Sequence, residues 1–308
     1  MGGLAQLVHS VSTAFAPGER PTTRFAPSPN GPLHLGHAWA AIAAHDLARA
    51  MGGRFLLRIE DIDGTRSRPE HVAGIIADMN WLGLACDAPP LFQSGRIAAY
   101  AAARDRLAAA GLAYPCFCSR GDIRVAIAAT PVRHGPDGPV YPGTCRALSR
   151  SDAEARIAAG APHGWRLDAA GAVARLGGAP GWTDLAAGPQ PGDAHALGDI
   201  LLWRRDAPAS YHLAVVVDDA ASGIDTIVRG RDLLAYSGMH RLLQRLLGLP
   251  EPRWWHHSLL LGQDGEKLAK SRGSLSLADL RRAGMDGRAL ADALRAGTLP
   301  TGISRDDV

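Results

Sequence analysis

Apolar and polar stretches alternate with turn signals in the first third of the chain, and their spacing predicts alternating strands and helices. Residues 33–51 are mostly alanine, leucine, histidine and isoleucine, which favours a helix, and the two glycines after them end it. Arg54–Ile59 has the apolar composition of a buried strand, and further helices are expected at about 69–83 and 94–111. Such a repeat predicts an α/β fold built on a doubly wound parallel sheet.

The repeat breaks near Tyr114, where an irregular segment rich in cysteine, proline and glycine begins. Regular patterns return with two apolar segments, 199–203 and 211–217, which we interpret as buried strands. A helix is expected over 233–249 and a strand over 254–261. The expected organisation is therefore a flexible leader at 1–21, the first half of the main domain at 22–113, an insertion at 114–192, the second half at 193–261, and a loop with a short helical tail at 262–308.

The composition is that of a globular protein, with 46% hydrophobic and 20% charged residues in a chain of 308. No apolar run approaches the roughly 18 residues of a membrane span, and the N-terminus lacks the basic start and apolar core of a signal peptide. We therefore expect a cytoplasmic monomer without a membrane partner. A net charge of +3 is compatible with a nucleic-acid partner but does not require one.

The only two lysines of the chain, Lys267 and Lys270, lie in one five-residue stretch, whereas thirty-one arginines are spread along the sequence. Because arginine serves elsewhere as the general cation, lysines at one place indicate a need for a compact ammonium group. Two solvated surface lysines that adjoin by chance are the alternative.

A pair of histidines lies at the expected start of the first helix. His34-Leu-Gly36-His37 follows the turn after the first strand, where helix N-termini of an open parallel sheet direct their amides at anionic ligands. Two imidazoles there could donate hydrogen bonds to nucleotide phosphates, and Gly36 would let a ligand approach the backbone. The alternative is that both histidines merely begin a helix.

Three of the four cysteines have a spacing that favours metal binding. Cys116 and Cys118 are too close in sequence for an easy disulfide, and Cys145 adds a third thiolate. Zinc prefers sulfur-rich sites with four ligands, and His134 or water is the default fourth ligand. Three reduced, buried cysteines without a metal are the alternative. Cys86 has no nearby partner.

Five segments resemble, in their order, the motifs of one enzyme family. RFAPSPNGPLHLGH, RIEDID, YHLAVVVDD, IVRGRDL and EKLAKS together resemble the catalytic core of class I glutamyl-tRNA synthetases over roughly residues 22–280. The resemblance implies a Rossmann-like catalytic domain in which HLGH and KLAKS bind ATP, with Mg²⁺ held mainly by the ATP phosphates. One departure is Ala269, where the family usually has a small hydroxyl residue.

The resemblance also implies roles for individual residues. Lys270, assisted by Lys267, would neutralise the pyrophosphate that leaves ATP when a carboxylate attacks the α-phosphate. His34, Gly36 and His37 would complete the ATP site. Glutamate would be bound by two carboxylate-binding arginines, two hydroxyl groups, and one carboxylate that holds its ammonium group: Arg24, Arg229, Ser28, Tyr211 and Glu60.

The resemblance has implications for the insertion and for the YHLAVVVDD segment as well. It points to Tyr141 as the fourth zinc ligand beside Cys116, Cys118 and Cys145. Asp218 and Asp219 could reach the ribose of ATP or order the nearby loop. Each of three proposed glutamate-binding residues also fits an ordinary role when it is considered alone. Glu60 could be a charged residue at a strand end, Arg229 a partner in a surface salt bridge, and Tyr211 a half-buried core aromatic.

The lysine motif lies close to the C-terminus, with 37 residues after Ser271. We expect no anticodon-binding domain there, because below about 40 residues a chain rarely builds its own core. The resemblance therefore favours truncated paralogues that activate glutamate with ATP, without tRNA, and transfer it to the queuosine base at the wobble position of tRNA(Asp). The alternatives are a catalytic fragment that charges tRNA(Glu) with a separate partner, and a non-catalytic tRNA-binding module.

Overall fold

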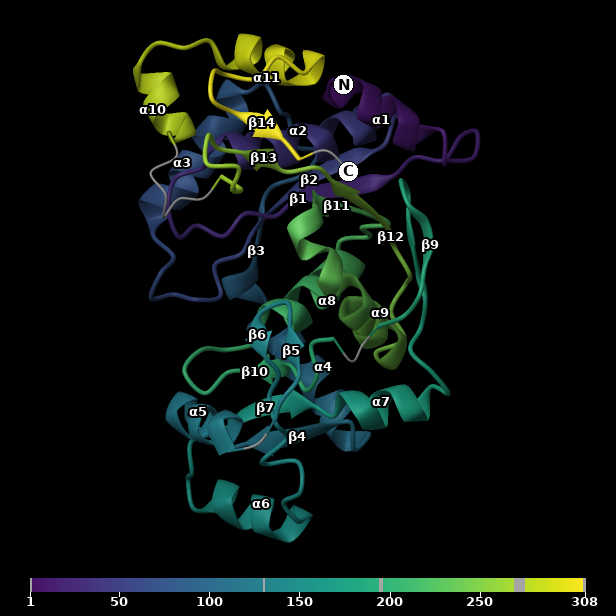
Figure 1. Ribbon diagram of the computed structural model, residues 1–308, viewed down its shortest axis with the longest axis vertical. Coiled ribbons are helices and arrows are strands. Elements are labelled where there is room, and N and C mark those ends of the chain that lie inside the picture. The colour runs from purple at the N-terminus through teal and green to yellow at the C-terminus, as the bar shows by residue number, and fades with distance from the viewer. Residues whose placement is uncertain (1, 130, 194–195, 269–274, 307–308) are drawn as a thin grey trace.

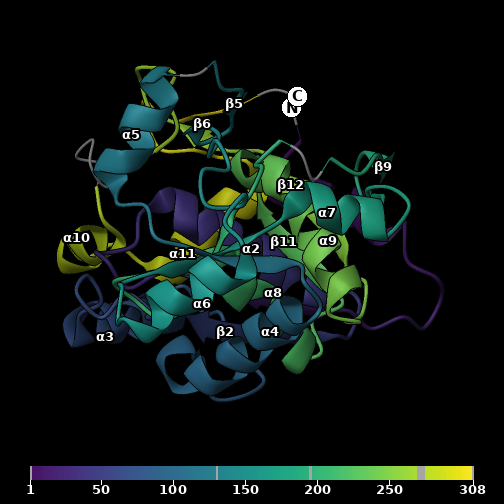
Figure 2. The same ribbon diagram turned by 90° about the horizontal axis from the view of Figure 1, so that it is seen from below.

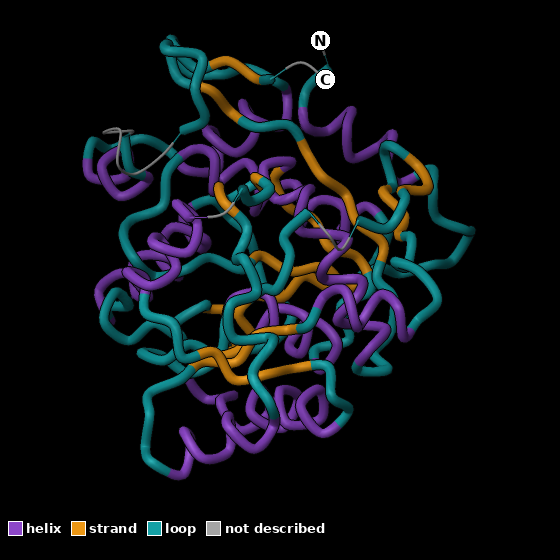
Figure 3. The backbone as a smooth tube through the Cα atoms, turned by 60° about the horizontal axis from the view of Figure 1, so that its bottom comes forward, coloured by secondary structure: helices purple, strands orange, loops and turns teal. Residues whose placement is uncertain are grey.

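The computed structural model describes residues 2–129, 131–193, 196–268 and 275–306 of the chain. The molecule is elongated, with both ends of the chain near its upper end in Figure 1 and an inserted subdomain at its lower end. Strands run through the interior and helices lie around them (Figure 3). Among the described residues, no helix is long and apolar enough to cross a membrane. The α/β architecture with parallel strands agrees with the predicted fold class.

The first half of the main sheet forms as the sequence pattern predicts. β1 (Thr22–Phe25) pairs in parallel with β2 (Arg54–Ile59), and β2 pairs in parallel with β3 (Leu91–Phe92). The crossovers between these strands and the helix after them also occupy the expected segments: α2 (Leu35–Ala50), α3 (Pro69–Trp81), the 3-10 helix η1 (Gln93–Arg96) and α4 (Ile97–Ala109).

The second half of the main sheet lies against the first. β11 (Thr226–Gly230) pairs in parallel with β12 (Arg253–His257), and β12 pairs in parallel with β8 (Trp182–Asp184). β9 (Gly188–Gln190) adds an antiparallel edge to β8. β1 contacts β11, so the C-terminal ends of β1, β2 and β11 lie together. Ligands of open parallel sheets bind at this edge.

The segment 211–217, predicted as a strand, is instead the start of helix α8 (Tyr211–Ala221). Its central residues are buried around the whole helix, and a short apolar run of this kind has no periodicity that separates a strand from a helix. Ser210 caps the helix, because its Oγ accepts a hydrogen bond from Leu213 N at 3.4 Å. The helix expected over 233–249 is present as the 3-10 helix η2 (Arg231–Tyr236) and α9 (Ser237–Leu246).

The insertion builds its own antiparallel sheet, and the insertion lies on the side of the molecule that faces the viewer in Figure 2. β7 (Gly164–Leu167) is the central strand, flanked by β4 (Ala113–Cys116) and β10 (Leu201–Trp203). The remaining elements of the insertion are three helices and a small hairpin: α5 (Arg120–Ala129), β5 (His134–Gly135), β6 (Gly138–Pro139), α6 (Arg150–Ala158) and α7 (Ala169–Arg175).

The boundary predicted between residues 192 and 193 differs from the observed one, because the chain passes between the two sheets more than once. β8 and β9 were expected in the insertion, yet they belong to the main sheet, where the Trp182 ring packs 5.4 Å from the ring of Trp254 on β12. β10 was expected in the second half of the main domain, yet it pairs with β7 of the insertion. Strand partners this distant in sequence cannot be assigned from local patterns.

The prediction of a flexible leader over residues 1–21 is wrong for residues 4–12, which form helix α1 (Leu4–Ser12). Leu4, Val8 and Val11 lie on one face of the helix and are at most 5% exposed. They join the main hydrophobic core, where α1 packs against α2 and α11 (Gly287–Ala296). The leader is therefore part of the folded domain.

The C-terminal segment, where a short helical tail was expected, forms two short helices and a strand. α10 (Leu277–Arg282) precedes α11, and β14 (Ser304–Arg305) pairs in an antiparallel manner with β13 (Leu260–Leu261). The strand expected over 254–261 is therefore divided into β12 and β13. This pairing places the final described residues beside the segment that leads into the lysine motif.

We expect Leu4→Ala to lower the free energy of unfolding by about 2–4 kcal/mol, because it removes a fully buried side chain and leaves a cavity. Urea denaturation followed by circular dichroism measures the change. His9→Ala, on the exposed face of the same helix, is the matched control and should change stability by less than about 0.5 kcal/mol. Equal effects of both substitutions would show that α1 does not stabilise the domain.

Candidate active site

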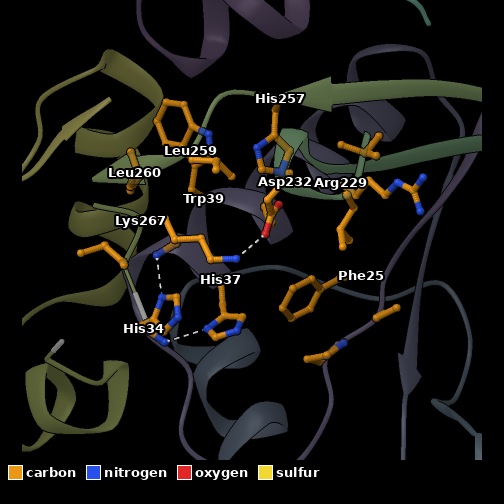
Figure 4. Close-up of a pocket in the computed structure, with 18 of the residues that line it drawn as sticks. Phe25, His34, His37, Trp39, Arg229, Asp232, His257, Leu259, Leu260 and Lys267 are labelled. Atoms are coloured by element: carbon orange, nitrogen blue, oxygen red, sulfur yellow. Dashed lines mark hydrogen bonds and ion pairs between the residues drawn. The ribbon is translucent and has the colours of Figure 1, made fainter. Parts of the chain in front are cut away.

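A cavity of about 690 Å³ lies where the C-terminal ends of β1, β2 and β11 meet the start of α2 and the start of α8 (Figure 4). All the predicted glutamate-binding and ATP-binding residues within the described part of the chain line it: Arg24, Ser28, His34, Gly36, His37, Glu60, Tyr211, Arg229 and Lys267. Lys270, with its neighbours Ala269 and Ser271, lies outside the described residues. Segments that are distant in sequence thus come together at one site.

The N-terminus of α2 presents both histidines of the HLGH motif to the cavity. His34 Nδ1 accepts a hydrogen bond from Gly36 N, and His37 Nδ1 accepts one from His34 N, each at 3.1 Å. Because Nδ1 accepts, each neutral imidazole carries its proton on Nε2, from which it can donate to a ligand. A Cβ on Gly36 would lie 3.0 Å from His34 Cε1. Gly36 therefore makes room for the His34 ring, whereas the sequence suggested that it makes room for a ligand.

Asp219 organises a buried group of charges beside the cavity. Arg24 Nε donates to Asp219 Oδ1 at 3.0 Å, and Arg58 Nη1 donates to the same oxygen. Arg58 Nη2 also donates to Glu60 Oε1 at 3.1 Å. Burial opposes the ionisation of Asp219, but the two guanidinium groups outweigh it and lower the pKa of this carboxyl. At Glu60 burial prevails over Arg58 and raises the pKa.

Arg229 is a buried cation whose hydrogen bonds go to uncharged groups. Its Nε donates to His256 Nε2 at 3.1 Å, its Nη1 to His240 Nδ1 at 3.2 Å, and its Nη2 to Ser237 Oγ at 2.8 Å. The residue is only 6% exposed, and burial lowers its pKa. Within the described part of the chain, no carboxylate forms an ion pair with Arg229.

Burial keeps the histidines around Arg229 neutral. It lowers the pKa of His256 to about 4, and it lowers the pKa of His240 well below the usual range. His256 Nδ1 donates to Asp184 Oδ2 at 2.7 Å, which leaves Nε2 as the acceptor for Arg229. The two imidazoles therefore orient the guanidinium group without neutralising its charge.

The buried charges around the cavity are not all paired with one another among the described residues. Arg24 and Arg58 form ion pairs with Asp219 and Glu60, whereas Arg229 forms none. None of these five side chains is more than about a tenth exposed. A third buried carboxylate, Asp184, is bonded to His256 and is separated from Arg229 by that neutral ring. A buried cation without a directly paired carboxylate is costly, so Arg229 is suited to a carboxylate of a ligand.

Lys267 lies on the other side of the same cavity. Its Nζ forms an ion pair with Asp232 Oδ2 at 2.9 Å, and Figure 4 shows the side chain beside His34 and His37. The lysine side chain is 55% exposed, so its ammonium group can reach both solvent and the cavity. The position suits an anionic group bound near the start of α2.

Asp218 does not line the cavity, so it is not placed to contact a ribose there. It accepts hydrogen bonds from Gln93 Nε2 at 2.9 Å, Arg96 Nε at 3.1 Å and Tyr100 Oη at 2.6 Å. These contacts fasten α8 to η1 and α4. Of the two roles that the sequence suggested, ordering of neighbouring segments is the one that fits Asp218.

Sequence reasoning missed several polar residues of the site. Arg58 precedes Glu60 by two positions at the end of β2, and strand alternation places both on one face, so a local signal for it existed. His240 and His256 gave no comparable signal, because their contacts with Arg229 join segments that are 11 and 27 residues apart. Asp232 becomes relevant only through its ion pair with Lys267.

The three predicted metal ligands of the insertion do come together. The Sγ atoms of Cys116, Cys118 and Cys145 all lie within 4.8 Å of one another. Tyr141 Oη lies 3.4 Å from Cys116 Sγ and 3.5 Å from Cys118 Sγ. His134, the other candidate for a fourth ligand, is exposed on β5 and does not belong to this group. The cluster could hold a metal ion.

Residues 21–304 match the family model described as tRNA synthetases class I (E and Q), catalytic domain. The chain is also similar to the crystal structure of glutamate-tRNA synthetase from Elizabethkingia anophelis, with a TM-score of 0.75 and 25% identity. That similarity covers 90% of this chain but only 61% of the other, so this chain spans less than two thirds of its length. The fold is that of a class I tRNA synthetase catalytic domain, and the protein is a ligase of this class.

The similarity is greater to a narrower group. A protein of Rhodobacter capsulatus named glutamyl-Q tRNA(Asp) synthetase is 46% identical over 85% of this chain and 95% of its own length. Proteins of the same name from Symbiobacterium thermophilum and Leptothrix cholodnii are 46% and 43% identical, over 85% and 92% of this chain and over 81% and 91% of their own lengths. The chain belongs to the glutamyl-Q tRNA(Asp) synthetase family.

We expect the protein to lose stability as the pH falls from 6.5 towards 4, in part because of His256. Burial lowers the pKa of this histidine from 6.5 to about 4, so in this window the unfolded chain binds a proton that the folded protein does not. A pKa shift of this size at a histidine with a buried side chain corresponds to about 3 kcal/mol in the free energy of unfolding. Thermal unfolding across this pH range measures the loss.

His256→Asn is the control for this pH dependence, because asparagine can donate to Asp184 and accept from Arg229 but does not titrate. The variant should lose less stability than the unmodified protein over the same range. If both proteins lose stability equally as the pH falls, His256 is not responsible for the loss.

Proposed function

We propose that the protein uses ATP to activate glutamate without tRNA, and that it then transfers the glutamyl group to the queuosine base at the wobble position of tRNA(Asp). The observation that carries the first step is the buried guanidinium group of Arg229, which forms no ion pair with a carboxylate among the described residues. L-Glutamate has two carboxylates, so one can pair with Arg229 while the other is left for Arg24. Glutamine has one carboxylate fewer and would leave one of these arginines without an anionic ligand group.

Each charged group of glutamate has a complementary group in the cavity. Arg229, which donates only to neutral protein groups, is suited to one carboxylate, and Arg24 faces the cavity as the candidate for the other. Glu60 has a raised pKa because it is buried, and an ammonium group beside it would stabilise its ionised form. Tyr211 and Ser28 line the same space and offer hydroxyl groups.

ATP would occupy the side of the cavity near the start of α2. The Nε2 protons of His34 and His37 are donors for its phosphates, and Mg²⁺ would be held mainly by the phosphates themselves. A carboxylate oxygen of glutamate forms a bond to the α-phosphorus, and pyrophosphate leaves with the electrons of the bond that breaks. Lys267, together with Lys270, neutralises the charge on this leaving group.

The acceptor is proposed from the relatives, because the curated proteins that this chain resembles are named glutamyl-Q tRNA(Asp) synthetase. The test uses labelled glutamate with three RNAs, namely tRNA(Asp) with queuosine, tRNA(Asp) without it, and tRNA(Glu). We expect label on queuosine-bearing tRNA(Asp) alone. Glutamate-dependent exchange between ATP and pyrophosphate should occur without any RNA, and glutamine should not replace glutamate. Label on tRNA(Glu) alone would refute the proposed acceptor.

Arg229→Gln provides the variant for this test. Loss of a buried cation that pairs with the substrate should lower kcat/KM for glutamate in the exchange reaction by about 100-fold or more. Arg245→Gln, an exposed arginine on α9 that does not line the cavity, is the matched control and should be unaffected. Unchanged exchange in Arg229→Gln would refute the charge argument.

We also propose that the cysteine cluster binds a structural zinc ion, with Tyr141 as the fourth ligand. The support is the donor set, because three thiolates and a phenolate lie around one point and zinc favours four-coordinate, sulfur-rich sites. Bound there, zinc would tie β4 to the segment that contains Tyr141 and Cys145. Its contribution would be to the fold of the insertion.

We expect one zinc ion per chain by metal analysis of protein purified without chelator. Cys145→Ser should lower the zinc content to a small fraction, because it removes one of three thiolates. Cys86→Ser is the control, since Cys86 packs against the main core away from the cluster, and its zinc content should be unchanged. Protein that is fully folded with no metal would refute the zinc site.

A further inference from the structure

The wall of the cavity that carries Lys267 belongs to a small antiparallel sheet in which β13 is the central strand. On one side of β13, Leu261 forms a β-bridge with Lys267, and Leu268 N donates to Leu260 O at 3.0 Å. On the other side β13 pairs with β14, with Leu260 opposite Arg305, and the two strands lie side by side in Figure 1. The lysine segment and β14 therefore flank the same strand.

Asp306 extends this pairing by one residue beyond β14, and it does so partly with its side chain. Its backbone N–H donates to Leu259 O at 3.0 Å, as the antiparallel register requires. The return bond from Leu259 N goes to the carboxylate oxygen Oδ1 of Asp306 at 2.5 Å. Leu259 is thus held through both of its main-chain polar groups, and one of these bonds is made to a charged acceptor.

A second contact connects Asp306 to the segment that holds the ammonium group of Lys267. Arg231 Nη1 lies 3.5 Å from Asp306 Oδ2 in an ion pair. The next residue along the chain, Asp232, forms the ion pair with Lys267 Nζ at 2.9 Å. The two carboxylate oxygens of Asp306 therefore bind the two segments that position Lys267, namely the strand beside it and the start of η2.

Asp306 acts from behind the cavity wall. Leu259, Asp232 and Lys267 line the cavity, whereas Asp306 and Arg231 do not. The side chains of Asp306 and Arg231 are 20% and 32% exposed, so solvent screens their ion pair only in part. Asp306 is thus placed to affect a ligand through the residues that it holds, and not by direct contact.

The described contacts of Asp306 all lie on the ATP side of the cavity. Figure 4 shows Leu259, Leu260 and Lys267 along one side, with His34 and His37 beside the lysine. The proposed glutamate side has separate supports, because Asp219 holds Arg24 and neutral side chains hold Arg229.

We infer that Asp306 is a positioning residue for the ATP step, which sets Lys267 beside the histidines at the start of α2. The inference rests on the proposed function, in which Lys267 neutralises the pyrophosphate that leaves ATP. An ammonium group on a flexible side chain stabilises a developing charge best when its backbone and its ion-pair partner are already fixed. Asp306 fixes both, although 39 residues separate it from the lysine in the sequence.

Asp306→Ala removes both side-chain contacts and tests this role in glutamate-dependent exchange between ATP and pyrophosphate. The kcat/KM for ATP should fall by about 10-fold or more, because Lys267 is misplaced. The KM for glutamate should stay unchanged, a difference that a general loss of stability would not produce. Asp306→Asn keeps an acceptor for Leu259 N and should recover most of the activity. Asp292→Ala removes a carboxylate that is 74% exposed on α11, and as the matched control it should change neither constant.

A double-mutant cycle shows whether Asp306 acts through Lys267. If it does, Asp306→Ala should lower kcat/KM for ATP much less in a Lys267→Ala background than in the unmodified protein. Equal losses in both backgrounds, or an unchanged kcat/KM for ATP in Asp306→Ala, would overturn the inference and leave the proposed function standing. Unmodified protein that catalyses no glutamate-dependent exchange would overturn both.

Discussion

Asp219 is the group on which both the fold and the site depend. Its carboxylate binds Arg24 at the end of β1 and Arg58 at the end of β2, residues that lie 195 and 161 positions away in the sequence. Without it, two buried guanidinium groups would face each other with only Glu60 between them, and such a loss typically costs several kcal/mol. Docking of α8 onto the first half of the sheet is therefore tied to assembly of the candidate site.

The neutral surroundings of Arg229 matter as much as the paired charges around Asp219. If His256 or His240 were replaced by a carboxylate, Arg229 would be neutralised by the protein and the cavity would no longer favour an anion. The pair of Asp184 and His256 avoids this result, because the carboxylate bonds Nδ1 and only the uncharged Nε2 reaches the arginine. The guanidinium group is thus held in place by neutral groups, and none of the described carboxylates forms an ion pair with it.

The sequence predicted the first strand–helix repeat well, because the segments from Arg24 to 83 have strong local patterns and clear turn signals. It failed at 211–217, where three consecutive valines favour a strand locally but tertiary packing places them in a helix with Val215 and Val216 buried. It also failed at the N-terminus, although Leu4, Val8 and Val11 have helical spacing, because the surface that covers them is formed by α2 and by α11 at the far end of the chain.

The candidate site was predictable to the extent that motifs identify it. Motif resemblance brought Arg24, Glu60 and Arg229 into one proposed pocket, and the structure places all three on one cavity. The charge balance was not predictable, because it depends on which carboxylates pair with which arginines. Those pairings join β1, β2, α8 and β11, and they exist only after the strands are in order.

The insertion takes part in the arrangement around Tyr211 because of where the chain leaves and rejoins the main sheet. Its β5–β6 hairpin faces the start of α8, so Asp137 from the insertion and His212 from the catalytic half line a second cavity of about 420 Å³. Tyr141, which follows this hairpin, lines the same cavity and also contacts the cysteine cluster. The cysteine cluster thus lies beside a wall of that cavity, whereas the buried arginines that line the first cavity belong to the main domain. The two cavities are therefore held by separate parts of the fold, and Tyr211 lines both.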